Sequence, residues 1–356
     1  MATNGKPLGS DLAAQIVISA DATTHSFPDA QQRIVEVSPE MTVDMGLQVL
    51  AKAGVCSAPV WDAENTKYLG FLDVLDLIAM AVDSVDLMTM LHTPMDIHQL
   101  ARDAAAQRQQ EEDAADTALK RQKTAVSHKT VAEMFANGEA LIGMQQWHPV
   151  YEGTSFRKVL ELLAHKCRRV AVLSLQTSRV VKIISQSAVV AMLYEHMRTQ
   201  GELVKETPGS TGFGIKPVLS VRQNTPARDA FRIMVEHCVS AVAVLDDKGA
   251  LLTTVSTRDI RMLVLPEFAH HAMLDLAVRD YVQRVRTRDP SLEARPAVIA
   301  VGLATSLTMV IGKLAATKSH RVFVEDAAGK CVGVISVNDV ILLLERGNHF
   351  GAAIAT

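Results

Sequence analysis

The chain carries one sequence unit four times, and this repetition limits its possible folds more than any other feature. Residues 240–246 align with 320–326, and at the same offset, without a gap, residues 256–259 align with 336–339. Such internal similarity predicts copies of one supersecondary unit that pack against each other. One copy alone is too small to bury its own sheet well, so the copies should pair.

The first half of the chain repeats the same pattern. Residues 56–62 align with 168–174, and these two copies also agree with the later pair. The spacing of the first and third copies differs by one residue, and we place this difference in the turn between two strands, where insertions are tolerated. The chain therefore holds four units, which we expect to form two tandem modules of two units each.

Each unit predicts the order helix, strand, turn, strand, helix. In the third copy, Thr225 can cap a helix whose first position suits Pro226, and the apolar residues of the run 227–235 fall on one face. Strands are expected at 240–245 and 251–255, joined by a turn, before a helix that begins at Ile260. The predicted fold class is α/β (α+β).

Composition narrows the class of protein. Of 356 residues, 48% are apolar and 21% charged, with a net charge of −3, which excludes wholesale disorder and a nucleic-acid binder that relies on a global basic field. The four cysteines have no C-x-x-C spacing, which favours reduced thiols and no metal site. A polar N-terminus and the lack of a long apolar run predict no membrane contact. We expect a cytoplasmic protein, with the nucleus as an alternative location.

Two segments lie outside the units. One is rich in Ala, Gln and charge, which favours a solvated helix or a partly disordered insert, or alternatively a helix that docks a partner. The other has the Pro, Gly and Ser content of a linker. The predicted boundaries are 1–26 (tail), 27–92 (first repeat), 93–146 (insert), 147–203 (second repeat), 204–214 (linker), 215–270 (third repeat), 271–347 (fourth repeat) and 348–356 (tail).

A Ser-x-x-Asp motif stands at a strand-to-helix junction, at Ser256–Asp259 and Ser336–Asp339. One interpretation is a capping box, in which the acid reaches back to the start of its own helix. The other is a ligand site, in which the helix N-terminus favours a phosphate and the carboxylate accepts hydrogen bonds from ribose hydroxyls. The spacing alone does not separate them.

Cations stand at the start of two otherwise apolar strands, as Arg168–Arg169 and His320–Arg321. One interpretation is a pair of side chains that snorkel to the surface. The other is the lining of a basic cleft for phosphates, because an unpaired buried charge is costly and Arg binds phosphate through two hydrogen bonds.

With these motifs, the fourfold pattern resembles tandem cystathionine-β-synthase (CBS) domains, paired as two Bateman modules that pack as a disc. Three stretches resemble the γ subunit of AMP-activated protein kinase more closely: 58–62 with 70–76, 237–244, and 320–326 with 333–339.

The resemblance implies roles for matched residues and regulatory ligands, AMP, ADP or ATP, without a catalytic cofactor. It also implies a Ser/Thr kinase catalytic subunit and a scaffold subunit as partners, and it leaves a homodimer open. Ala188 replaces the ribose carboxylate in the second copy, which predicts one empty cleft. The implied nucleotide-binding residues are Asp76, Asp259 and Asp339 for ribose, Ser256 and Ser336 beside them, Arg168, Arg169, His320 and Arg321 for phosphate, and Ser240 at a matching polar position.

Some residues depart from the γ pattern. Cys56 and Cys238 stand where that subunit has arginines, Ser187 where it has a lysine, and Asp73 brings a second carboxylate close to Asp76. Two function classes therefore stay open: a non-catalytic adenine-nucleotide sensor of cellular energy, and a stand-alone CBS interaction or scaffold protein with partly degenerate clefts. An enzyme is disfavoured, because no catalytic motif is present and the repeats leave no room for a catalytic domain.

Overall fold

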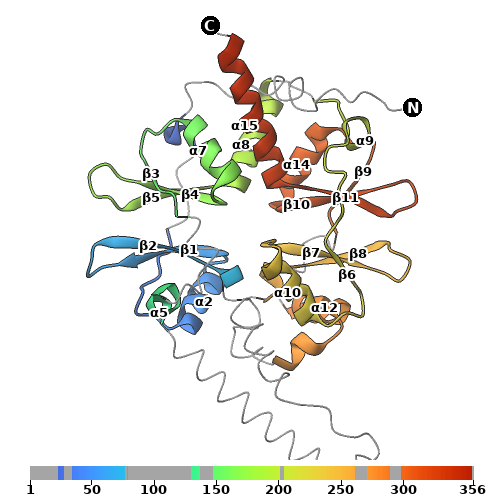
Figure 1. The fold of residues 1–356 in the computed structure, drawn as a ribbon, viewed down its shortest axis with the longest axis horizontal. Coiled ribbons are helices and arrows are strands. Elements are labelled where there is room, and N and C mark those ends of the chain that lie inside the picture. Colours follow the sequence, from blue (N-terminus) through green and yellow to red (C-terminus); the bar gives the residue numbers. More distant parts are fainter. Residues whose placement is uncertain are drawn as a thin grey trace, which may run out of the picture.

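The structure is a computed structural model, and four β-hairpins of identical register organise it (Figure 1). In each hairpin, the first residue of one strand pairs with the last residue of the next: Ser57 with Asp73, Arg169 with Ser185, Ala241 with Ser256 and Arg321 with Ser336. Each has a register shift near its far end. The fourfold repeat predicted from the sequence is confirmed. The described residues are 23–27, 34–76, 78, 130–136, 147–200, 204–260, 271–288 and 298–354.

The hairpins have turns of different length. The first and third hairpins keep the same pairing up to their register shifts, and the extra residue of the first lies beyond the shift, in the turn. The predicted position of the one-residue difference is therefore confirmed. The hairpin strands are β1 (Ser57–Asp62), β2 (Lys67–Asp73), β4 (Arg169–Leu173), β5 (Val180–Ser185), β7 (Ala241–Leu245), β8 (Leu251–Ser256), β10 (Arg321–Glu325) and β11 (Cys331–Ser336).

A short parallel strand precedes each of the last three hairpins and was not predicted. These strands are only two or three residues long, too short for an alternating pattern to reveal them. A single parallel bridge from Val37 to Val60 takes their place in the first copy. The short strands are β3 (Val150–Tyr151), β6 (Ser220–Arg222) and β9 (Ala300–Gly302), each paired with the first strand of its hairpin.

Two predicted helix starts are wrong. The helix of the third copy begins at Ala227 with Pro226 as its N-cap, and Thr225 instead closes a backbone turn by donating its N–H to Arg222. The helix that follows β8 starts at Thr257 rather than Ile260. The helices are η1 (Thr24–Ser26), α2 (Val43–Lys52), α5 (Val131–Ala136), α7 (Phe156–His165), α8 (Gln186–Gln200), α9 (Pro208–Thr211), α10 (Ala227–Glu236), α11 (Thr257–Ile260), η4 (His271–Asp275), α12 (Val278–Arg288), α14 (Leu307–Thr317) and α15 (Val337–Ile354). Apart from α5, the predicted insert lies outside the described residues.

Two large helical cores join the halves of the chain. One packs α7 and α8 of the second copy against α14 and α15 of the fourth, and the other packs helices of the first copy against those of the third. Within the first half, the sheets meet directly, through residues such as Phe71 and Ala171. Figure 1 shows the consequence: helices form two outer layers, and the hairpins face each other between them.

Candidate functional site

A cavity of about 1030 Å³ lies between the hairpins and is lined by residues of all four copies. Among the described lining residues, the only carboxylate is that of Asp73. The cationic and imidazole side chains of the lining are His165, Lys166, Arg168, Arg169, Lys216, Arg258, Lys318, His320 and Arg321.

The shared hairpin register explains why these cations meet. Because every first strand starts at the same point of its sheet, the residues before and at these starts line one cavity. The second copy contributes Arg168 and Arg169, and the fourth contributes His320 and Arg321. The third copy has Ser240 there, and it supplies its cation, Arg258, from the motif Ser-Thr-Arg-Asp instead.

Neighbouring copies hold these arginines in place. Arg321 donates from Nη1 to the carbonyl of Ala241 at 2.6 Å and from Nη2 to Ser240 Oγ at 3.1 Å. Arg168 donates to the carbonyl of Cys238, across the two modules. Arg169 forms an ion pair with Asp73 at 3.2 Å and keeps 16% of its side chain exposed. The contacts favour the basic cleft over a snorkelling surface pair.

The concentration of positive charge shifts two pKa values. Burial, followed by the fields of Arg258, Arg169, Arg321 and Arg168, lowers the pKa of His320 from 6.5 to about 3. Burial and then Arg168 lower the pKa of Arg321 from 12.5 to about 10. The imidazole is therefore neutral, and the site disfavours further positive charge. An anion with several negative charges would relieve this repulsion.

The two Ser-x-x-Asp carboxylates of the second half share one local geometry. Oδ2 of Asp339 accepts hydrogen bonds from the N–H and Oγ of Ser336, both at 2.7 Å. Oδ2 of Asp259 accepts the equivalent bonds from Ser256, also at 2.7 Å. Each Asp thus caps its own strand-to-helix junction through Oδ2, as the capping interpretation predicts. Whether the carboxylate can also bind a ligand depends on the partners of Oδ1.

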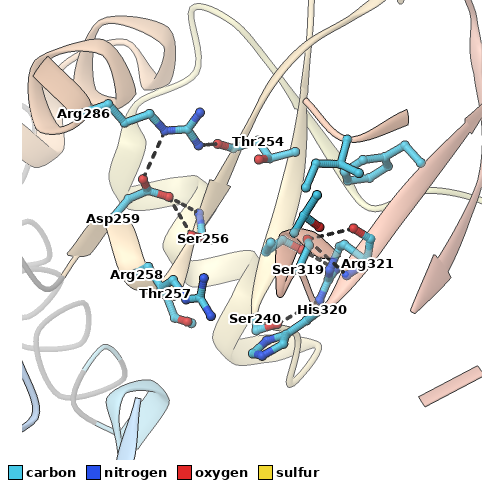
Figure 2. Close-up of a pocket in the computed structure, with 14 residues that line it drawn as sticks. Ser240, Thr254, Ser256, Thr257, Arg258, Asp259, Arg286, Ser319, His320 and Arg321 are labelled. Atoms are coloured by element: carbon cyan, nitrogen blue, oxygen red, sulfur yellow. Dashed lines mark hydrogen bonds and ion pairs between the residues drawn. The ribbon is translucent and has the colours of Figure 1, made fainter. Parts of the chain in front are cut away.

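The second oxygens differ in their partners. Oδ1 of Asp339 faces Lys216 at 2.7 Å, in a pair whose side chains are 21% and 44% exposed. Asp259 is only 1% exposed, and its Oδ1 lies 3.4 Å from Nε of Arg286 (Figure 2). The fourth cleft is therefore open, whereas the third holds a small pocket of about 100 Å³.

The clefts of the first half have a different character. Asp76 is 1% exposed and accepts the backbone N–H of Asp73 at 3.2 Å. Phe71, which stands where the third copy has Thr254, packs against Trp147 with ring centroids 5.1 Å apart. An aromatic pair thus stands in the first copy where the third copy has a threonine. The second cleft opens into the cavity at Ala188 but lacks the carboxylate.

Seven of the ten predicted site residues line the large cavity or lie at its edge. Ser256 and Asp259 line the small third pocket, which shares Ser240, His320 and Arg321 with that cavity, whereas Asp76 is buried at its own junction. Sequence analysis missed Arg258, which was visible within its motif, and gave no signal for Arg286 or for the other basic residues of the cavity, His165, Lys166, Lys216 and Lys318. The seven are Arg168, Arg169, Ser240, His320, Arg321 and Ser336, which line the cavity, and Asp339, which Ser336 holds at its edge.

Comparison with known proteins agrees with this fold. Residues 213–265 and 291–346 match the model of the CBS domain. The chain is 24% identical to the SNF1-related protein kinase regulatory subunit gamma-1 of Arabidopsis thaliana, over 92% of this chain and 82% of that protein. It is 23% identical to the bovine 5'-AMP-activated protein kinase subunit gamma-3, over 90% of this chain but 58% of that protein.

A solved structure shares the arrangement of the repeats. It is that of a Methanocaldococcus jannaschii protein described as an archaeal homologue of the γ subunit, with a TM-score of 0.60, 17% identity and coverage of 88% of this chain and 96% of that one. The CBS-domain matches lie in the third and fourth copies, and the fold of all four copies is that of tandem CBS-domain proteins paired as two Bateman modules. Within that class, the chain resembles the γ subunit of AMP-activated protein kinase.

Two further features concern only the part of the chain that the structure describes. No helix there combines the length and apolar character needed to cross a membrane. Nor do three or more His, Cys, Asp or Glu side chains gather there as a metal site would require.

Proposed function

We propose that the protein is a non-catalytic regulatory subunit that binds an adenine nucleotide in its fourth cleft and so reports cellular energy state to a kinase. The observation that carries this proposal is that Asp339 stands partly open at the edge of the cationic cavity. Ribose hydroxyls would replace Lys216 on Oδ1 of Asp339, and the phosphate would lie towards Arg321 and His320. AMP, ADP and ATP are the ligands to test.

Regulation requires that the nucleotide distinguishes two conformations. A ligand that binds both states equally shifts neither. Arg168 and Arg321 each donate to a carbonyl of another copy, so a phosphate that attracts these guanidinium groups would loosen contacts between copies. The proposed partners are a Ser/Thr kinase catalytic subunit and a scaffold subunit, because the relatives are named as kinase regulatory subunits.

Calorimetric titration with AMP, ADP and ATP tests the binding. Asp339→Asn should weaken AMP binding by about tenfold or more, because a hydrogen bond to a charged acceptor contributes about 1.5–3 kcal/mol. Asp247→Asn, on an exposed turn, is the matched control and should bind as wild type does. Equal binding by all three proteins would refute the assignment of Asp339.

A second function is favoured by the closed clefts. Asp76 and Asp259 are both 1% exposed, as expected of an interaction or scaffold protein whose clefts are structural. In that case none of the three nucleotides binds at millimolar concentration. Copurification from cells that express the protein at native level would then identify its partners and show whether a kinase is among them.

A further inference from the structure

The third cleft contains an arginine of its own chain at the place where a ribose would bind. Asp259 accepts Ser256 through Oδ2 and faces Arg286 through Oδ1. We propose that Arg286 is a specificity-determining residue that excludes nucleosides from the third cleft, so that adenine nucleotides bind in the fourth cleft and not in the third. This inference rests on the proposed function, which it makes specific to one cleft.

Arg286 is fixed by more than its ion pair. Its Nη2 donates to the carbonyl of Thr254 at 2.7 Å, and its Nη1 lies 3.3 Å from Thr253 Oγ1. The guanidinium therefore bridges the end of β8 to the carboxylate of the motif. A ligand that displaced it would have to compensate several hydrogen bonds together.

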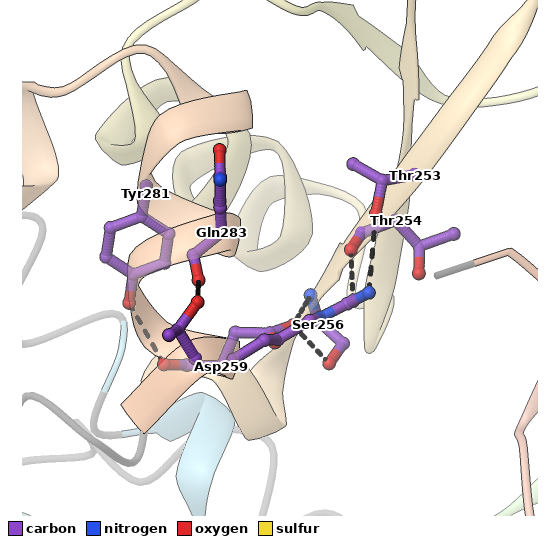
Figure 3. A network of polar contacts seen from close by, with 8 residues as sticks. Thr253, Thr254, Ser256, Asp259, Tyr281 and Gln283 are labelled. Atoms are coloured by element: carbon purple, nitrogen blue, oxygen red, sulfur yellow. Dashed lines mark hydrogen bonds and ion pairs between the residues drawn. The ribbon is translucent and has the colours of Figure 1, made fainter. Parts of the chain in front are cut away.

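The helix that carries Arg286 is also anchored at this site. Tyr281, on the same helix α12, donates its hydroxyl to the carbonyl of Asp259 at 3.0 Å, as Figure 3 shows. Tyr281 is fully buried and packs edge-on against Phe231, with centroids 5.5 Å apart. Because α12 is held at both the carbonyl and the carboxylate of Asp259, Arg286 cannot move aside as a free surface side chain would.

The fourth cleft provides an internal comparison. Asp339 has the same two bonds from its serine, but the ion-pair partner of its Oδ1 is a lysine whose side chain is 44% exposed. Exposed pairs of this kind are weak and are readily exchanged for other partners. The pair of Arg286 with Asp259 is costlier to break, because the carboxylate is 1% exposed and would be left buried without its partner. The two clefts thus share the Ser-x-x-Asp motif and differ in the residue that pairs with its carboxylate, which is Arg286 in the third cleft and Lys216 in the fourth.

The small volume of the third cleft is consistent with the exclusion of a nucleoside. The pocket has a volume of about 100 Å³, whereas sites for small organic ligands usually measure roughly 300–1,000 Å³. Arg258, His320 and Arg321 line the same pocket, and Figure 2 shows His320 and Arg321 across it from Arg286. Removal of the Arg286 side chain would enlarge the pocket and free Oδ1 of Asp259, while the cations that favour a phosphate would remain.

The experiment compares AMP stoichiometry by calorimetry in wild type, Arg286→Ala and Arg286→Lys. We expect Arg286→Ala to bind one more AMP than wild type. Arg286→Lys should keep the wild-type stoichiometry, because its ammonium group would face Asp259 from a position that is 18% exposed, in contrast to Lys216 at 44%. Arg284→Ala, at an exposed position of the same helix, is the matched control and should match wild type. An unchanged stoichiometry in a folded Arg286→Ala variant overturns the inference.

Hydrogen exchange of the wild-type protein keeps the inference testable if Arg286→Ala does not fold. Saturating AMP should leave amide protection at 253–260 and 278–288 unchanged. Altered protection in both segments would mean that AMP enters the third cleft, and the inference would be wrong.

The two proposals fail in different ways. If wild type binds no AMP and Arg286→Ala binds one, the exclusion of nucleotides by Arg286 is supported and the fourth-cleft site is refuted. If both proteins bind one AMP and Asp339→Asn abolishes it, the proposed function holds and Arg286 does not determine specificity. If neither binds AMP, both proposals are refuted.

Discussion

Lowering the pH should destabilise the protein through His320. Burial, followed by the field of four arginines, lowers the pKa of His320 to about 3 in the folded state, against 6.5 for an ordinary histidine. Below pH 6.5 the unfolded chain takes up a proton that the folded chain refuses, so this contribution to stability is complete above pH 6.5 and is lost as the pH falls towards 3. Between pH 7 and pH 5 the loss is at most ~2 kcal/mol, an upper value because a half-buried imidazole retains part of its hydration.

Urea denaturation at pH 7 and pH 5 measures this loss. Carboxylates also titrate in this range, so the informative quantity is the difference between wild type and His320→Gln, which cannot be protonated. We expect the variant to lose about 2 kcal/mol less than wild type over this interval. If the two proteins lose the same stability, His320 does not carry the low pKa, and the argument from the arginine cluster is wrong.

Two other predictions follow from local packing. Gly333→Ala should lower the free energy of unfolding by roughly 1–3 kcal/mol in thermal or urea unfolding, because a Cβ there would lie 2.3 Å from the carbonyl oxygen of Gly214. Gly302→Ala is the control and should change stability little, because the nearest atom to its Cβ would lie at 4.0 Å. Equal effects of the two substitutions would contradict the close approach at Gly333. Alkylation followed by mass spectrometry should modify the exposed Cys238 well before Cys167, since burial raises the pKa of the Cys167 thiol to about 11, and faster modification of Cys167 would refute this.

The sequence predicted the hairpins well because they depend on local information. Two apolar strands and a turn recur in all four copies, and the Ser-x-x-Asp junction recurs in the third and fourth, where the structure places Ser256 and Ser336 at identical positions of their hairpins. The short parallel strands and the start of the helix at Ala227 escaped prediction, because a strand of two or three residues has no period and a cap depends on backbone geometry.

The candidate site was only partly predictable. The strand-start cations were visible as charges in apolar strands, and they do line one cavity. Lys216 and Arg286 carried no such signal, because each acts on a carboxylate distant from it in sequence: Lys216 on Asp339, and Arg286 on Asp259. Which carboxylate remains accessible is thus decided by contacts between segments.

The sequence by itself determined the repeated unit, its chemistry and the absence of a carboxylate at Ala188, because these are properties of residue type and spacing. Only the tertiary structure decided that helices of the second copy pack with those of the fourth, and those of the first with the third. It also decided that the four strand starts face one cavity and that two identical motifs differ in access. The physical reason is that burial and charge density arise from packing between residues far apart in the sequence. The sequence of one repeat, read alone, does not specify which other repeat packs against it.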